Sequence, residues 1–95
     1  MTMDYEINHE FDNFLKDFSN GIKDCTLYFD EDWYEDEYSY NDIHEAQGIL
    51  FEKIITFLHN HQSKDYVVGG DYCIRVMTIK EANKRGLRIN QYMIM

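Results

Sequence analysis

Two stretches of the chain repeat apolar residues at the spacing of an α-helix, and this pattern constrains the fold more than any other. Residues 4–22 carry one apolar stripe, made of Ile7, Phe11, Phe14, Leu15, Phe18 and Ile22. Residues 42–61 carry a wider one, made of Ile43, Ala46, Ile49, Leu50, Phe51, Ile54, Ile55, Phe57, Leu58 and His61. At 3.6 residues per turn, each set falls on one side of a helix. We therefore predict two amphipathic helices, of which the second is the most buried element.

Local signals indicate where these helices begin and end. Asn20-Gly21 can end the first helix before Ile22, because glycine suits the position after a helix C-terminus. Asp42, with Glu45 three positions later, fits a capping box and predicts the start of the second helix. Gly48, inside that helix, indicates close approach of another backbone.

The pattern changes to strands after Ser63. Tyr66–Val68, Gly69-Gly70 and the stretch 71–77 predict a hairpin with a tight glycine turn. Residues 87–95 form a third candidate strand. The linker 78–86 fits either a short helix, capped by Thr78 and stopped by Gly86, or a long hairpin loop.

Residues 26–29 are also prone to form a strand, with residues 37–40 as a candidate partner. The segment between them would be a connection or an edge-strand extension. At 95 residues the chain is long enough for one modest core. We predict a single α+β domain over residues 1–95, with two amphipathic helices packed on a mostly antiparallel sheet of three to five short strands.

Six of the eight residues from position 30 to position 37 are acidic: Asp30, Glu31, Asp32, Glu35, Asp36 and Glu37. We call this segment the acidic run; its other two residues are Trp33 and Tyr34. Blocks of like charge are usually disordered, but disordered acidic tracts are poor in aromatic residues. Large rings tend to attach a segment to a core or an interface. We therefore interpret the acidic run as a fixed negative surface.

The net charge of −9 is divided unevenly along the chain. Residues 1–45 have a net charge of −12, and residues 46–95 have a net charge of +3. A surface this negative repels nucleic-acid backbones and anionic membranes but attracts proteins with basic clefts. No apolar stretch approaches the length of a membrane helix, and Asp4 and Glu6 occupy the region where a signal peptide would be basic. We expect a cytoplasmic protein, in the host cell if phages encode it, with no membrane partner.

No pattern in the chain predicts catalysis, a cofactor or a metal. His59 and His61 point to different sides of a helix, and paired Cys/His spacings are missing. The acidic run lacks the central glycine and the alternating ligands of a calcium loop. Cys25 and Cys73 fit buried thiols, or a pair with each other. We expect a protein that is not an enzyme.

Acidic residues also recur on the first predicted helix, beside its apolar stripe. Carboxylates four residues apart on a helix are roughly 5–6 Å apart, similar to successive phosphates along one DNA strand. We predict one partner-binding surface, which we call the acidic face: Glu6, Glu10, Asp17, Asp30, Glu31, Asp32, Glu35, Asp36, Glu37, Asp42 and Glu45. Trp33 and Tyr34 would be its aromatic anchors. The alternative is a solvated surface that serves only solubility.

In size, in an isoelectric point near 4.6 and in clustered acids, the chain resembles small acidic phage-encoded inhibitors that mimic DNA. These include anti-restriction proteins, anti-CRISPR proteins and uracil-DNA glycosylase inhibitors. It is most similar to the coliphage anti-restriction nuclease inhibitors, whose target is a restriction enzyme acting on modified cytosine. The resemblance implies a host DNA-binding protein or nuclease as the partner, with no direct binding of nucleic acid.

Five basic residues near the C-terminus depart from this class, in which most members are acidic throughout: Arg75, Lys80, Lys84, Arg85 and Arg88. One interpretation is charge balance against the acidic half. Another is a regulatory or antitoxin-like protein that binds nucleic acid through this basic cluster. The apolar residues 91–95 favour a homodimer if they form an edge strand, because unpaired backbone groups attract a partner strand.

Overall fold

The computed structural model describes residues 3–21, 24–27, 29, 34, 37–61, 65–69, 74–87 and 92–94. Its helices are α1 (Asp4–Ser19), α3 (Tyr40–Asn60) and α4 (Ile79–Lys84). Its strands are β1 (Asp24–Leu27), β2 (Tyr66–Gly69), β3 (Ile74–Thr78) and β4 (Tyr92–Ile94). None of the helices in these ranges is long and apolar enough to cross a membrane.

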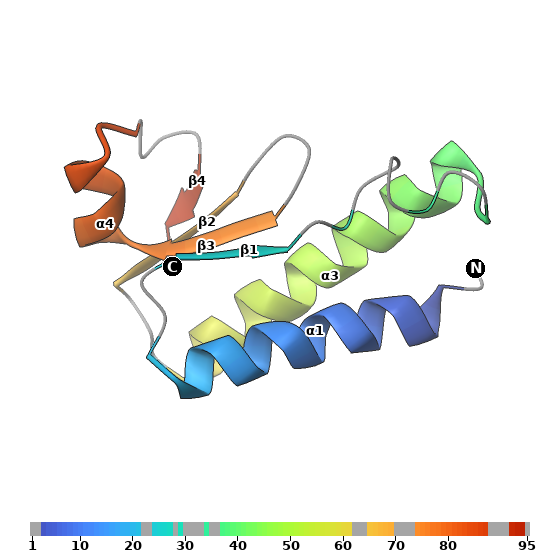
Figure 1. Cartoon of the computed structure of the whole chain (residues 1–95), viewed down its shortest axis with the longest axis horizontal. Helices are drawn as coiled ribbons and strands as arrows, with labels where there is room; N and C mark the ends of the chain where they lie inside the picture. Colours follow the sequence, from blue (N-terminus) through green and yellow to red (C-terminus); the bar gives the residue numbers. More distant parts are fainter. Residues whose placement is uncertain are drawn as a thin grey trace.

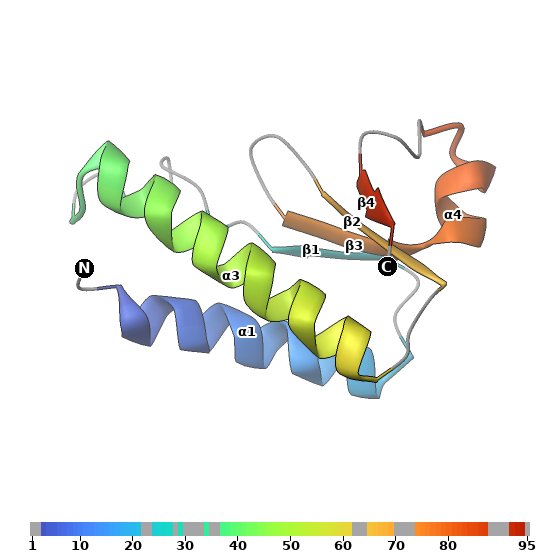
Figure 2. The ribbon, with the colours of Figure 1, turned by 180° about the vertical axis from the view of Figure 1, so that it is seen from behind.

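The four strands form one sheet in the order β1-β3-β2-β4, and each neighbouring pair is antiparallel. Strands β1 and β2, the two neighbours of β3, therefore run parallel to each other. Helix α3 lies between them in the sequence. Helices α1 and α3 lie side by side against one face of the sheet and begin at the same end of the molecule (Figures 1 and 2). The predicted α+β class, with two amphipathic helices on an antiparallel sheet, is confirmed.

Alternation along the strands divides the apolar residues between two cores. Val68 and Val76 are paired across β2 and β3, and both belong to the main core beneath α1 and α3. The next pair, Val67 and Met77, contacts Ala82 of α4 in a second, smaller core. Successive side chains of a strand point to opposite faces, so α4 covers the face opposite to α1 and α3.

The predicted stripe of the first helix is confirmed. Ile7 and Phe14 are buried, and the ring of Phe14 lies 5.6 Å from that of Phe57 on α3 in an edge-on arrangement. The helix ends at Ser19, before Ile22, which lies outside the described residues. Gly21 has a φ of +75°, a left-handed conformation that favours glycine and stops the helix.

Two predictions for the segment before the second helix are wrong. Residues 37–39 form a turn and bend that lead into α3, so they are not the partner strand of β1. Helix α3 begins at Tyr40, and its N-cap is Ser39, whose hydroxyl oxygen accepts a hydrogen bond from the backbone N–H of Asp42. Serine is a strong N-cap, and it places Asp42 inside the first turn, where a negative charge suits the helix dipole.

Gly48 does not mark a close approach of another backbone, as the sequence predicted. It is exposed, and nothing lies within 4 Å of the position that a Cβ atom would occupy. Glycine inside a helix costs up to about 1 kcal/mol relative to alanine. We expect Gly48→Ala to raise the free energy of unfolding, measured by urea denaturation, by about 0.5–1 kcal/mol.

Gly21→Ala is the matched control for this substitution. Its positive φ strains any side chain, so it should lower the same free energy of unfolding. A destabilising Gly48→Ala would contradict the open environment of this position.

The C-terminal elements largely follow the prediction. The hairpin of β2 and β3 is confirmed, but Gly69 pairs with Arg75, which leaves a longer connection than a two-residue turn. Residues 70–73 lie outside the described residues. The linker contains helix α4, capped by the Thr78 hydroxyl and followed by Gly86 at a φ of +69°. The third predicted strand is β4, which pairs with β2 at one edge of the sheet.

Candidate protein-interaction face

The structure describes some of the predicted partner-binding residues, and the others lie outside the described residues. It places Glu6, Glu10 and Asp17 on α1, Asp42 and Glu45 on α3, and Tyr34 and Glu37 in the segment between β1 and α3. Asp30, Glu31, Asp32, Trp33, Glu35 and Asp36 lie outside the described residues.

Glu6, Glu10 and Asp17 lie on the flank of α1 that faces β1 and the segment before α3. The opposite flank of α1 contacts α3 through Phe11, whose ring lies 6.1 Å from that of Phe57. On the acidic flank, an Asp17 carboxylate oxygen accepts a hydrogen bond from the Cys25 thiol at 3.1 Å. Near the other end of the helix, Glu6 accepts one from the Tyr38 hydroxyl at 2.5 Å. The acidic flank of α1, with Glu6 and Asp17, is therefore held beside β1 and beside the segment before α3.

Aromatic rings attach the segment before α3 to the main core. Phe29 is buried, and its ring lies 5.1 Å from that of Tyr34, which lies 6.1 Å from that of Tyr38. The backbone N–H groups of Glu37 and Tyr38 both donate to the Tyr34 carbonyl, which closes a turn. Gln47 of α3 donates to the Phe29 carbonyl at 2.6 Å. Tyr34, predicted as an anchor for a partner, is partly buried and packs against this protein's own core.

Three side chains on this flank have raised pKa values. Burial raises the pKa of Tyr34 to about 12, and the nearby Glu10 and Glu6 carboxylates contribute. The hydrogen bond to Glu6 raises the pKa of Tyr38 to about 12. Burial, followed by the hydrogen bond to Asp17, raises the pKa of the free Cys25 thiol to about 12. Nearby negative charge adds to each of these shifts, because it disfavours the ionised form of a thiol or a phenol.

Asp42 and Glu45 lie near the N-terminus of α3, at the end where α1 also begins (Figure 1). Two helix N-termini at one end concentrate positive partial charge, which acidic residues in the first turns stabilise. Asp4 and Glu6 occupy the first turn of α1, and Asp42 occupies that of α3. Some acidity at this end therefore also has a structural role.

The basic cluster is partly neutralised within the molecule. Arg85 donates to Asp24 at 2.6 Å and to Glu81 at 2.9 Å, and Arg75 donates to the same Asp24 carboxylate at 3.3 Å. The interpretation as internal charge balance is confirmed for these two arginines. Lys80 and Lys84 are exposed on α4, and Arg88 lies outside the described residues.

Sequence reasoning missed Asp24, Cys25 and Tyr38 as partners of these charged residues. The contacts join positions that are far apart in the chain, such as Glu6 and Tyr38, 32 residues apart, or Asp24 and Arg85, 61 residues apart. The helical spacing of the acidic residues indicated that they share one flank of α1. No local signal in the sequence identified the residues that pack against this flank.

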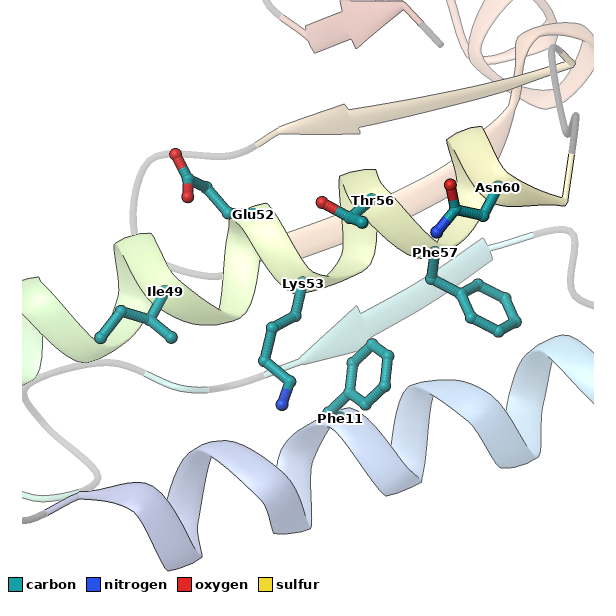
Figure 3. A pocket seen from close by; sticks show the side chains of 7 residues that line it. All are labelled: Phe11, Ile49, Glu52, Lys53, Thr56, Phe57 and Asn60. Atoms are coloured by element: carbon teal, nitrogen blue, oxygen red, sulfur yellow. The ribbon is translucent and has the colours of Figure 1, made fainter.

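A shallow groove of about 440 Å³ lies between α1 and α3 (Figure 3). Phe11 comes from α1, and the other lining residues, Ile49, Glu52, Lys53, Thr56, Phe57 and Asn60, come from α3. The Lys53 ammonium lies 5.1 Å from the centre of the Phe11 ring and donates to the Asn8 side chain at 3.2 Å. The groove is thus on the flank of α1 opposite to the acidic stripe and carries a cation.

Within the described residues, no group of three or more histidine, cysteine or acidic side chains is arranged to hold a metal ion. His59 lies in the last turn of α3, and His61 follows it with its ring stacked on Phe57. Comparisons with protein-family models, curated proteins and solved structures find no match for this chain.

Proposed function

We propose that this protein is a DNA-mimic inhibitor without enzyme activity, which occupies the nucleic-acid cleft of a host defence nuclease, a restriction enzyme, in the host cytoplasm. The acidic face makes the contact. The observation that carries the proposal is geometric: Glu6, Glu10 and Asp17 share one flank of α1, and hydrogen bonds from Tyr38 and Cys25 hold that flank against the rest of the molecule. These carboxylates belong to one ordered flank instead of being scattered around the molecule.

The spacing of the carboxylates suits the groups that a nuclease uses on DNA. Glu10 and Asp17 are about two helical turns apart, roughly 10–11 Å along α1, which is close to twice the separation of successive phosphates along a strand. A DNA-binding cleft presents lysines and arginines to such a row of charges. Charge complementarity also makes association fast and sensitive to salt, because such steering is screened over about 8–10 Å near physiological ionic strength.

Inhibition of DNA cleavage tests this proposal. The probe is a modified-cytosine-dependent restriction nuclease, the target class that the resemblance implies, assayed at about 50 mM and about 200 mM salt. We expect inhibition at low salt that weakens strongly at high salt. Inhibition of a CRISPR nuclease alone would instead make this an anti-CRISPR protein, and no effect on either nuclease would contradict the proposal.

A second candidate function is a regulatory or antitoxin-like protein that binds nucleic acid through the basic cluster. Lys80 and Lys84, which are exposed and one turn apart on α4, favour it. The ion pairs of Arg75 and Arg85 with Asp24 count against it, because these two arginines already have an acidic partner. A direct DNA- and RNA-binding assay separates the two functions: mimicry predicts no binding, whereas the regulator predicts binding that is lost when Lys84, Arg85 and Arg88 are replaced.

The position of β4 favours a homodimer in either case. Its backbone pairs with β2 on one side and forms an edge of the sheet, where a partner strand can add. We expect sedimentation velocity to give twice the chain mass of 11.5 kDa. Prolines placed singly at Met93 and at Ile94 remove one N–H from each side of β4, so one of the two should restore the monomer mass; a monomer for the unmodified chain would contradict this arrangement.

A further inference from the structure

We infer that Glu6 and Tyr38 form a positioning pair that holds the segment before α3 against α1, and that Glu6 is not itself a contact for the target. This inference rests on the proposed function and assigns different roles to residues within the acidic face. Glu6 orients this face, whereas the other carboxylates of the acidic face contact the target.

The surroundings of the Glu6 carboxylate support this role. One oxygen accepts the hydrogen bond from Tyr38, and the other is buried with no hydrogen-bond partner among the described residues. A carboxylate whose oxygens are engaged or buried is poorly placed to meet a lysine or arginine on another protein. Glu45, by contrast, is exposed on α3.

The contact joins two parts of the chain that are 32 residues apart. Tyr38 comes directly after the acidic run in the sequence and directly before Ser39, the N-cap of α3. The ring of Tyr34 packs between those of Phe29 and Tyr38, which holds the turn from the inside. The hydroxyl of Tyr38 adds a hydrogen bond to Glu6 of α1. The turn from Tyr34 to Tyr38, including Glu37, therefore stays beside the acidic flank of α1.

Hydrogen bonds to a charged group are stronger than neutral ones, and the hydroxyl of Tyr38 is a stable donor. Its pKa is raised to about 12 by the bond to Glu6, so the phenol keeps its proton well above the pH at which an ordinary tyrosine ionises. Binding surfaces that are held in place before contact lose less conformational entropy on association. Tyr38→Phe, which removes the donor and changes no charge, should therefore weaken target binding.

The test compares Tyr38→Phe, Glu6→Gln and the double variant in inhibition of the modified-cytosine-dependent nuclease at two salt concentrations. Tyr38→Phe should weaken inhibition by roughly tenfold or more, the size expected for one hydrogen bond to a charged group. Glu6→Gln should weaken it by roughly threefold to tenfold, because the amide oxygen still accepts from Tyr38 but without charge assistance. The double variant should be no worse than Tyr38→Phe, and the salt dependence should stay that of the unmodified protein.

Two matched controls carry the same chemical changes at exposed positions. Tyr40→Phe, at a side chain that is 58% exposed, should leave inhibition unchanged. Glu45→Gln removes the same charge as Glu6→Gln from a solvated site, so it should reduce the salt dependence. If Glu6→Gln reduces the salt dependence while Tyr38→Phe has no effect, Glu6 is a contact and the inference is wrong, although the proposed function stands.

Hydrogen exchange provides a readout that needs no target. Tyr38→Phe should accelerate amide exchange in a peptide covering residues 29–39 and leave β2 and β3 unchanged. Unchanged exchange in that peptide would overturn the inference whatever the nuclease assay gives. Absence of inhibition by the unmodified protein, combined with faster exchange in Tyr38→Phe, would instead reject the proposed function and retain the structural role of the pair.

Discussion

Neutralising four carboxylates of the acidic run is expected to weaken inhibition of the nuclease about 100-fold or more, because close charge pairs across an interface are coupled by roughly 1.5 kcal/mol or more each. The substitutions are Asp30→Asn, Asp32→Asn, Glu35→Gln and Glu37→Gln. They keep the size of each side chain and raise the net charge by four. The measurement is the inhibition constant at low and high salt, and the variant should also show a smaller dependence on salt.

A control with the same change in net charge separates the acidic face from the total charge. It replaces four exposed acids outside the acidic face by their amides, namely Asp4, Asp12, Glu52 and Asp65. This variant should inhibit within a few-fold of the unmodified protein. Equal losses in both variants would mean that only the net charge matters, and the alternative of a solvated, unspecific acidic surface would then hold.

The second large effect concerns the contact between the two long helices. Phe14 is completely buried, and its ring lies within 6 Å of the rings of Phe11, Phe18 and Phe57. We expect Phe14→Ala to lower the free energy of unfolding by about 3–5 kcal/mol, because it removes a large buried side chain and leaves a cavity. This loss is a large part of the about 5–15 kcal/mol that stabilises a typical domain.

Urea denaturation followed by circular dichroism measures this loss. Tyr40→Ala is the control, since this ring is 58% exposed and its removal should cost less than about 0.5 kcal/mol. A loss below about 1 kcal/mol for Phe14→Ala would contradict the packing of α1 on α3.

The long helices were predictable because their signal is local and periodic. The stripe from Ile7 to Phe18 and the one from Ile43 to Leu58 both correspond to buried faces. The start of α3 was misplaced because Asp42 and Ser39 are both good caps, and sequence alone does not say which of them has the extended backbone of an N-cap. Residues 37–40 were the predicted strand partner of residues 26–29, but the partner of β1 is β3, about fifty residues later.

The candidate site was predictable only as a pattern. Helical spacing correctly placed Glu6, Glu10 and Asp17 on one flank of α1. It could not reveal that Tyr38 and Cys25 face that flank, nor that Asp24 neutralises Arg75 and Arg85, because these contacts depend on how distant elements pack. Which charged residues share a surface therefore depends on the tertiary structure, and the order of charges along the chain does not decide it.

Competition with DNA tests the central claim most directly. A fluorescent duplex is bound to the modified-cytosine-dependent nuclease, and this protein is added while the anisotropy is followed. We predict that the anisotropy falls to that of free DNA, and that higher salt weakens the displacement. A stable complex containing the nuclease, the duplex and this protein together would contradict the claim that its carboxylates take the place of phosphates.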